Sequence, residues 1–155
     1  MAIFVAMEFS KGEGIDYEDT FRIVARYSSI KSILALLAQM RWKIDQMDVK
    51  TTFLNGVIEE DVYDENPEGF ETFNRQSHVC RLKQALYGLK QAPRSWYTRI
   101  DNYFTRLGFT KSEVDVNLYL IKVEGKFLII VLYVDYLILT SDEKLIKYCK
   151  EDTAR

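Results

Sequence analysis

The sequence is poor in the residues from which many catalytic and metal sites are built. Its 155 residues include one histidine, His78, and two cysteines, Cys80 and Cys149. One histidine leaves little material for a histidine-based catalytic triad. The two cysteines lie too far apart for a metal-type spacing, and they indicate reduced thiols, as in the cytoplasm or the nucleus.

Long apolar runs, repeats and low-complexity segments are missing as well. The longest nearly apolar run, residues 127–140, is too short to span a bilayer, which needs ~20 apolar residues, so we expect no membrane partner. At 48% hydrophobic and 14% aromatic residues, the chain is nevertheless too apolar to be disordered. Its length suits one domain with a real core, and its net charge of −2 neither favours nor excludes a nucleic-acid partner.

The run at residues 127–140 contains a single acid, Asp135, near its centre. The flanking segments, 127–134 and 137–140, have strand length and are rich in β-branched and aromatic residues. We therefore predict a tight hairpin with Asp135 and Tyr136 at its tip. Two interpretations of Asp135 stay open. It is a turn residue, since aspartate favours turns, or it is a metal-binding carboxylate presented by two rigid strands.

The remaining periodic segments predict helices and short strands. One helix covers residues 28–41 and begins at the capping pair Ser28 and Ser29, and another runs from Pro93 to the capping residue Gly108. The buried stripe of the second helix consists of Trp96, Tyr97, Ile100, Tyr103, Phe104 and Leu107. We also predict strands at residues 1–9, 42–49, 57–63, 79–82 and 118–123. A turn is predicted at Asn55–Gly56, and a last helix at residues 143–150. Consecutive strands joined by short turns pair antiparallel, so the predicted class is α+β, with helices packed on one face of an antiparallel sheet.

Charge is unevenly distributed along the chain. Residues 59–71 contain seven acids and no base, whereas residues 79–100 contain five bases and no acid. The bases are Arg81, Lys83, Lys90, Arg94 and Arg99, and the aromatic residues Tyr87, Trp96 and Tyr97 lie among them. A basic, aromatic segment suits a phosphate-bearing partner. The alternative is a solvated helix face whose long side chains cover apolar surface.

Two acids, Asp48 and Asp135, end predicted strands of the same sheet, so they could meet. A carboxylate pair on neighbouring strands can hold divalent cations, and two ions ~3.5–4 Å apart can activate a hydroxyl nucleophile and stabilise a leaving group. Mg²⁺ suits such a site because it keeps water ligands and needs only one or two protein carboxylates. Two separated aspartates are also easily a chance pair, and the residues alone do not decide between these interpretations.

Several stretches, in order along the chain, resemble the reverse transcriptase of copia-type LTR retrotransposons, a part of their Pol polyprotein. They are residues 14–21 (GIDYEDTF), 46–56 (QMDVKTTFLNG), 67–70 (PEGF), 79–97 (VCRLKQALYGLKQAPRSWY), 107–113 (LGFTKSE) and 132–135 (LYVD). The resemblance covers nearly the whole chain. It implies a right-hand polymerase fragment over residues 1–155, with fingers and palm but without thumb or RNase H.

The resemblance also implies roles for individual residues. Asp48 and Asp135 match catalytic aspartates, and together with Val49 they form the implied site for two Mg²⁺ ions. Phe53 matches the bulky residue that excludes a ribose 2′-hydroxyl, although the residues alone favour a core aromatic. Gln91 is expected to contact nucleotide or template. Lys50 and Arg94 either contact phosphate or are solvated surface residues. The implied partners are an RNA or DNA template with its primer and deoxynucleoside triphosphates, in the cytoplasm or nucleus or in a virus-like particle.

The chain departs from the family pattern at critical positions. Tyr136 occupies the position of the second hairpin aspartate, and a phenol carries no charge at neutral pH. Met7 and Glu8 replace family bases near the start, which should weaken triphosphate binding if those bases meet it. We therefore expect little or no polymerase activity. The alternatives are an inactive retroelement remnant and a retained nucleic-acid-binding module that uses the basic segment.

Overall fold

A computed structural model of the chain describes Val5 and residues 23–64, 79–141, 143 and 145–147. The chain divides into two compact units, which are described separately: the first unit comprises Met1–Arg22 and Thr51–Arg99, and the second comprises Ile23–Lys50 and Ile100–Arg155. His78, Cys149, Met7, Glu8 and most of the predicted strand at residues 1–9 lie outside the described residues. Only Glu143 and residues 145–147 of the predicted last helix are described, and they are helical.

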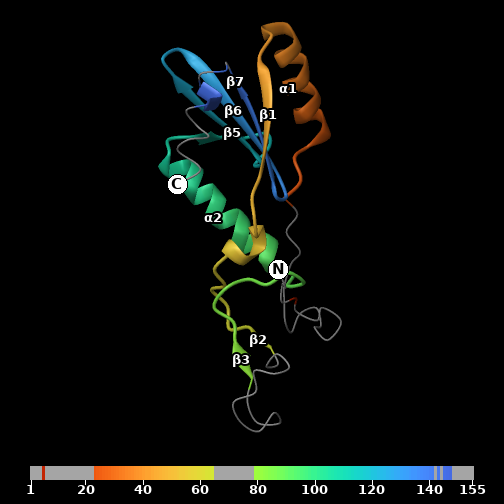
Figure 1. Ribbon diagram of the computed structural model, residues 1–155, viewed down its shortest axis with the longest axis vertical. Coiled ribbons are helices and arrows are strands. Elements are labelled where there is room, and N and C mark those ends of the chain that lie inside the picture. Colours follow the sequence, from red (N-terminus) through yellow and green to blue (C-terminus); the bar gives the residue numbers. More distant parts are fainter. Residues whose placement is uncertain (1–4, 6–22, 65–78, 142, 144, 148–155) are drawn as a thin grey trace. The chain divides into compact units, whose positions relative to one another are not determined.

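The second unit is built on a five-stranded sheet in which every neighbouring pair is antiparallel (Figure 1). The strand order is β1-β7-β6-β5-β4. The bounds are β1 Lys43–Asp48, β4 Thr110–Lys111, β5 Leu118–Val123, β6 Lys126–Tyr133 and β7 Tyr136–Ser141. The predicted strands at residues 42–49 and 118–123 and the apolar hairpin are confirmed. The short edge strand β4 has no alternating apolar pattern, so the sequence did not predict it.

The tip of the β6–β7 hairpin lies one residue earlier than predicted. Tyr133 pairs with Tyr136, so Val134 and Asp135 are the two turn residues and Tyr136 is the first residue of β7. Val134 has a positive φ of 55°, whereas Asp135 does not have a positive φ. This combination is typical of a type II′ turn, which is favoured between two strands because its twist matches theirs.

The two helices pack on opposite faces of the sheet, so the prediction that they share one face was wrong. Helix α1 (Tyr27–Met40) buries Ile33 and Leu37 against Ile129 and Val131 of β6. On the other face, the ring of Phe104 in α2 (Ala92–Arg106) lies 4.9 Å from that of Tyr119 in β5. The physical reason is that β6 is apolar at five consecutive positions, all of them buried, and successive side chains point to opposite faces. The class remains α+β.

Helix α2 follows its predicted pattern. Pro93 is its second residue, and Gly108 behind its last turn has a φ of 87°, which glycine adopts without strain. Trp96, Ile100 and Phe104 of the predicted stripe are buried. Tyr97, Tyr103 and Leu107 are half-buried. The amphipathic pattern therefore predicted the inward face of this helix correctly.

The start of α1 differs from its prediction, because Ser28 and Ser29 are not its N-cap. Arg26 holds that position and makes no side-chain capping bond. The carboxylate of Asp115, which is 3% exposed, accepts hydrogen bonds from the backbone N–H groups of Arg26 (2.9 Å) and Asn117 (3.1 Å). The Ser29 hydroxyl bonds to the same carboxylate. A distant acid thus satisfies the helix start, where a negative charge is favourable.

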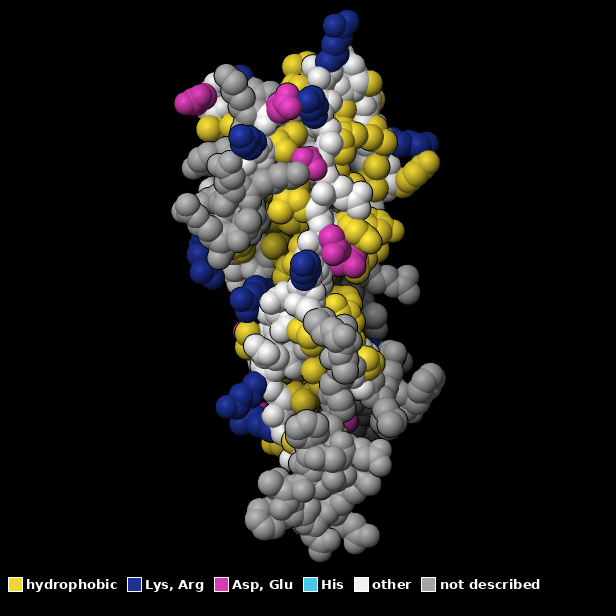
Figure 2. All heavy atoms as spheres, in the orientation of Figure 1, with side chains coloured by type: hydrophobic (Ala, Val, Ile, Leu, Met, Phe, Trp, Pro, Cys, Tyr) yellow, Lys and Arg dark blue, Asp and Glu magenta, His cyan; other side chains and the backbone are white. Residues whose placement is uncertain are grey.

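Apolar side chains also remain on the outside of the second unit. Figure 2 shows them as a yellow area over α1 and β1. The most exposed large apolar side chains on α1 and β1 are Tyr27 (72%), Ile44 (52%) and Met40 (51%). The high hydrophobic content of the sequence is therefore divided between the core and this surface.

The first unit has little regular structure. It contains the 3₁₀ helix η2 (Thr52–Asn55), the strand pair β2 (Tyr63–Asp64) and β3 (Cys80–Arg81), and the first half of α2. Its core consists of Ile58, Val62, Ala85, Leu89 and Ala92, against which Phe53, Leu82 and Leu86 pack.

The prediction of a strand at residues 57–63 was largely wrong. Within that range only Tyr63 belongs to a strand, and Val57 forms an isolated bridge with Gln84. The exposed acids Glu59, Glu60 and Asp61 interrupt the alternation that a half-buried strand needs. The shorter strand predicted at residues 79–82 is confirmed as β3.

The buried Asp115 predicts a defined loss of stability in acid. Burial alone would raise its pKa, but hydrogen bonds from the Ser29 hydroxyl and the backbone N–H groups of Arg26 and Asn117 outweigh burial and hold the pKa below 3.8. A lowered pKa stabilises the fold at pH values above the ordinary pKa, and this stabilisation is lost as the pH falls through the folded-state pKa. The free energy of unfolding should therefore drop as the pH is lowered below 3.8.

Asp115→Asn tests this expectation by urea unfolding over a pH series. The variant should lose about 1–3 kcal/mol at pH 7, because the charged acceptor of buried donors is removed, and its stability should fall less in acid. Glu113→Gln, at an exposed acid two residues away, is the matched control and should behave like the unmodified chain. An acid dependence that is identical in Asp115→Asn and the unmodified chain would contradict this role.

Candidate active site

The structure brings Asp48 and Asp135 to the same end of the sheet. Strand β1 pairs with β7 so that Asp48 lies directly opposite Tyr136, the residue after Asp135. Beyond this pair, the Val49 N–H donates a hydrogen bond of 2.9 Å to the backbone carbonyl of Asp135. The two acids therefore occupy adjacent positions across two bonded strands, although they are far apart in the sequence.

Both carboxylates are open to solvent to some extent. Asp48 is exposed, whereas Asp135 and Val49 are half-buried. Among the residues that the structure describes, no group of three or more His, Cys, Asp or Glu side chains could hold a metal ion. Two carboxylates fit one hard cation that keeps several water ligands, as Mg²⁺ does, but they offer little charge for a second.

Tyr136 is the residue that lies directly opposite Asp48. Residues directly opposite each other on neighbouring strands point to the same face of a sheet, so Tyr136 shares the face of Asp48. Tyr133, its partner on β6, lies on that face too, and each tyrosine is 40% exposed. The row across the three strands is thus one carboxylate followed by two phenols, and it lacks a second negative charge.

The turn that carries Asp135 is strained and held from two sides. Val134 has a φ of 55°, and a β-branched residue in this left-handed region costs roughly 1–2 kcal/mol. The Val134 N–H donates to the Ile23 carbonyl (2.9 Å), while the Asp135 carbonyl accepts from Val49. Strain of this kind persists only where the surroundings fix the backbone, and it is common at functional sites. The contribution of Ile23 comes from its backbone, so no side-chain pattern could have revealed it.

The other predicted site residues are divided between the units. Lys50 is exposed and follows Val49 in the second unit. Phe53, Gln91 and Arg94 belong to the first unit, where Phe53 and Gln91 are half-buried and Arg94 is exposed. Phe53 meets the ring of Tyr87 edge-on at a centroid distance of 5.2 Å and packs against the core of that unit.

The loop that carries Phe53 is fixed on helix α2. Thr51 enters η2 with a φ of 54°, and the Asn55 side-chain amide donates to the Thr51 carbonyl at 3.2 Å. Arg99 in turn donates from Nη1 to the Asn55 carbonyl at 3.0 Å. A β-carbon at Gly56 would lie 2.9 Å from Cβ of Ser95. Asn55–Gly56, predicted as a simple turn, therefore forms the end of η2 and a close contact with the helix.

The basic segment is partly occupied by contacts within the first unit. Arg81 forms an ion pair with Asp61, and Arg99 bonds to the Asn55 carbonyl. These contacts give two of the five bases a structural role. They reduce the part of the segment that a phosphate-bearing partner could use.

The close approach at Gly56 predicts a large effect of adding one methyl group. Gly56→Ala should lower the free energy of unfolding by about 1–3 kcal/mol, because the new β-carbon would also lie 3.0 Å from the backbone nitrogen of Trp96. The φ of Gly56 is −72°, so backbone strain does not contribute. Urea unfolding measures the loss. Gly125→Ala is the control for strain alone, because its φ is 80° and its β-carbon would meet no atom within 4 Å. A Gly56→Ala variant as stable as the unmodified chain would refute this packing.

Comparisons with known proteins agree on one family. Residues 1–155 match the family model described as reverse transcriptase (RNA-dependent DNA polymerase). The chain is 40% identical over 99% of its length to the retrovirus-related Pol polyprotein from transposon TNT 1-94 of Nicotiana tabacum. It is 37% identical over 92% of its length to the corresponding polyprotein from transposon RE1 of Arabidopsis thaliana, and 35% identical over 94% to that from RE2.

The chain spans only 12%, 10% and 10% of the lengths of these three relatives. No solved structure matches it. Within the described part of the chain, no helix is long and apolar enough to cross a membrane. Because the family model covers every residue and the relatives are Pol polyproteins of copia-type elements, the resemblance seen in the sequence is confirmed, and the chain belongs to the reverse transcriptase family of retrotransposon Pol polyproteins.

Proposed function

We propose that residues 1–155 form the fingers and palm of an RNA-directed DNA polymerase, and that the second unit is the palm. The observation that carries this proposal is the register of β1 against β7, which brings Asp48 and Asp135 to one end of the sheet. The strained turn at Val134 adds support, because it holds Asp135 in one fixed backbone geometry. The partners would be a template with its primer and deoxynucleoside triphosphates.

Each predicted site residue has a role in this proposal. Asp48, Val49 and Asp135 would hold Mg²⁺, which when bound helps to activate the primer 3′-hydroxyl and stabilise the leaving pyrophosphate. Phe53 would exclude a ribose 2′-hydroxyl, and its edge-on contact with Tyr87 limits its movement. Lys50, Gln91 and Arg94 would contact nucleotide, template or phosphate. The exposure of Lys50 and Arg94 is compatible with such contacts.

Tyr136 is the reason to expect that this copy is impaired. It contributes no negative charge, and its ring shares the sheet face of Asp48. The remaining donor set suits one Mg²⁺ ion, whereas the proposed reaction uses two. An inactive retroelement remnant is therefore the second candidate function. Localisation in the cytoplasm, the nucleus or a virus-like particle stays a prediction.

Reversion of Tyr136 tests the chemical argument directly. In primer extension on an RNA template with Mg²⁺ or Mn²⁺, the unmodified chain should give no product above background. Tyr136→Asp should raise extension by ~10²-fold or more, the scale expected when one group that stabilises the transition state is restored.

The matched control is Tyr133→Asp, which adds the same charge on the same sheet face at equal exposure. It should leave extension at background, because β6 lies one strand farther from Asp48 than β7 does. Robust synthesis by the unmodified chain would refute the impairment. An equal rise in extension in both variants would show that added charge, and not the position of Tyr136, limits the reaction.

Metal binding gives a second test that does not depend on catalysis. Titration with Mn²⁺, followed by the loss of the free-ion paramagnetic resonance signal, should show tighter binding to Tyr136→Asp than to the unmodified chain, because a third carboxylate joins the site. Adding Asp48→Asn to that variant should weaken binding at least to the unmodified level. Binding that is unaffected by both substitutions would place the cation elsewhere and contradict the proposed site.

A further inference from the structure

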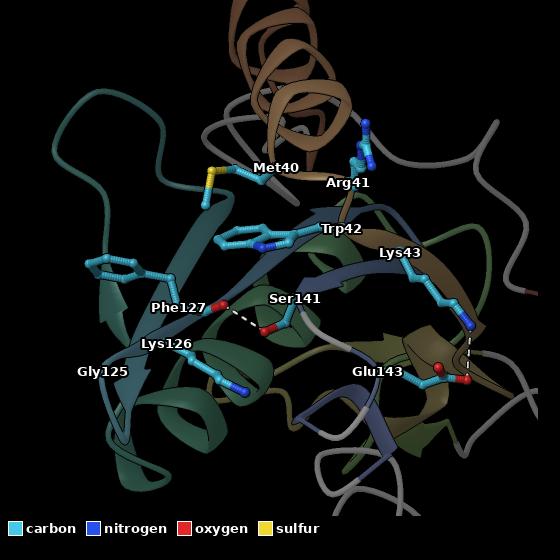
Figure 3. A pocket seen from close by; sticks show the side chains of 9 residues that line it. All are labelled: Met40, Arg41, Trp42, Lys43, Gly125, Lys126, Phe127, Ser141 and Glu143. Carbon is cyan, nitrogen blue, oxygen red and sulfur yellow. Dashed lines mark hydrogen bonds and ion pairs between the residues drawn. The ribbon is translucent and has the colours of Figure 1, made fainter.

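A hollow of about 640 Å³ lies in the second unit at the start of β1 (Figure 3). Its walls come from the end of α1, the β5–β6 turn, the end of β7 and the residue Glu143. The lining residues are Met40, Arg41, Trp42, Lys43, Gly125, Lys126, Phe127, Ser141 and Glu143. A volume of this size is within the range of small-molecule sites, roughly 300–1,000 Å³.

This hollow is separate from the candidate active site. Lys43 and Ser141 pair at one end of the β1–β7 ladder, whereas Asp48 and Tyr136 pair at the other. A six-residue strand spans roughly 17 Å at ~3.3 Å per residue. A ligand in the hollow would therefore meet neither aspartate of the candidate active site.

Aromatic rings and a thioether provide the apolar part of the lining. Figure 3 shows the Trp42 ring between Met40 and Ser141. Phe127 lies on β6, the strand next to the one that carries Ser141. Trp42 is half-buried and packs against the core beneath α1, and its backbone N–H donates to the Leu37 carbonyl at 3.2 Å. Phe127 is 47% exposed. The hollow thus presents a ring that the surrounding core holds in place beside a second, accessible ring.

The charged part of the lining is mainly basic. The charged lining residues are Arg41, Lys43 and Lys126 and one acid, Glu143, which forms an ion pair with Lys43 at 2.9 Å. The Arg41 side chain points outward at the rim of the hollow (Figure 3). The whole chain carries a net charge of −2, so this excess of positive charge is local. A ligand that combines a flat apolar group with negative charge would match both parts of the lining.

We propose that this hollow binds one nucleotide of a single-stranded nucleic acid, with its base against Trp42 and its phosphate near Lys126. Bases of a single strand can leave their stack and lie on an aromatic side chain, whereas those of a duplex are enclosed. The binding requires neither Asp48 nor Asp135, so it is independent of whether the chain has polymerase activity.

Photocrosslinking of the full chain to an eight-residue oligonucleotide that contains 5-iododeoxyuridine tests the position of the base. Mass spectrometry of the digest should find the crosslink on Trp42 or Phe127. Crosslinks confined to other aromatic residues, such as Tyr87 or Trp96, would overturn the proposal, and so would a lack of any crosslink at low salt. A large excess of free thymidine triphosphate should not prevent the crosslink. Competition by the triphosphate as strong as that by the oligonucleotide would overturn the assignment to a single strand in favour of a free nucleotide.

Variants then test the lining. Trp42→Ala should weaken the site-specific crosslinking affinity about tenfold or more, as expected for one lost base–aromatic stack. Because Trp42 also contacts the core, Lys126→Ala is the second variant, at an exposed position. It should reduce the slope of log affinity against log salt by about 0.7, the contribution of one single-strand phosphate contact.

The matched control is Tyr27→Ala. Tyr27 is an exposed aromatic residue of the same unit with the Lys31 ammonium 4.5 Å from its ring centre, but it does not line the hollow. This variant should bind like the unmodified chain. A Lys126→Ala variant with an unchanged salt slope, or a loss in Tyr27→Ala equal to that in Trp42→Ala, would refute the assignment.

Discussion

The pairing of β1 with β7 is the constraint on which the rest of the second unit depends. It joins the chain just before Thr51, where the second segment of the first unit begins, to the hairpin at residues 126–141, and it ends in the Val49 N–H bond to the Asp135 carbonyl. A slip of one residue in this register would turn every side chain of β1 to the other face of the sheet. The same register that aligns Asp48 with the hairpin tip also aligns Lys43 with Ser141 at the opposite end. One ladder therefore determines both the candidate active site and the hollow at its far end.

Packing on both faces is what makes this register unique. The central strand β6 is apolar on both sides, so the sheet is stable only when α1 covers one face and α2 the other. Asp115 adds hydrogen bonds that connect two segments, because its carboxylate accepts from Arg26 at the start of α1 and from Asn117 just before β5. The Ile23 carbonyl lies just before that helix and accepts the bond from Val134. The segment before α1 therefore holds the backbone of the β6–β7 turn at Val134, and the packing of α1 on the core holds that segment in place.

The sequence predicted those features that depend on neighbouring residues. The apolar hairpin, β5 and helix α2 have strong local patterns, and each was found where it was expected. The proximity of Asp48 and Asp135 could also be predicted, since both acids end strands of one sheet. The opposite placement of the helices and the capping of α1 by Asp115 could not, because each depends on residues far apart in the chain. The turn was misplaced by one residue because valine is a poor residue for a positive φ, so its position there had no local signal. For Phe53, packing alone indicates a core aromatic, and only the family resemblance gives it a role with substrate.

Tyr136 suits its position in the fold of the second unit. Tyrosine has a high preference for strands, and a Tyr133–Tyr136 pair contributes roughly 0.2–1 kcal/mol across an antiparallel ladder. A carboxylate at the same position would lie beside Asp48 and Asp135 and would be repelled by both unless a cation were bound. Tyrosine at this position therefore avoids a destabilising cluster of like charges and fits the register of the ladder. The turn at Val134, in contrast, costs stability, and it fixes the backbone at Asp135 in the way that strained turns at functional sites do.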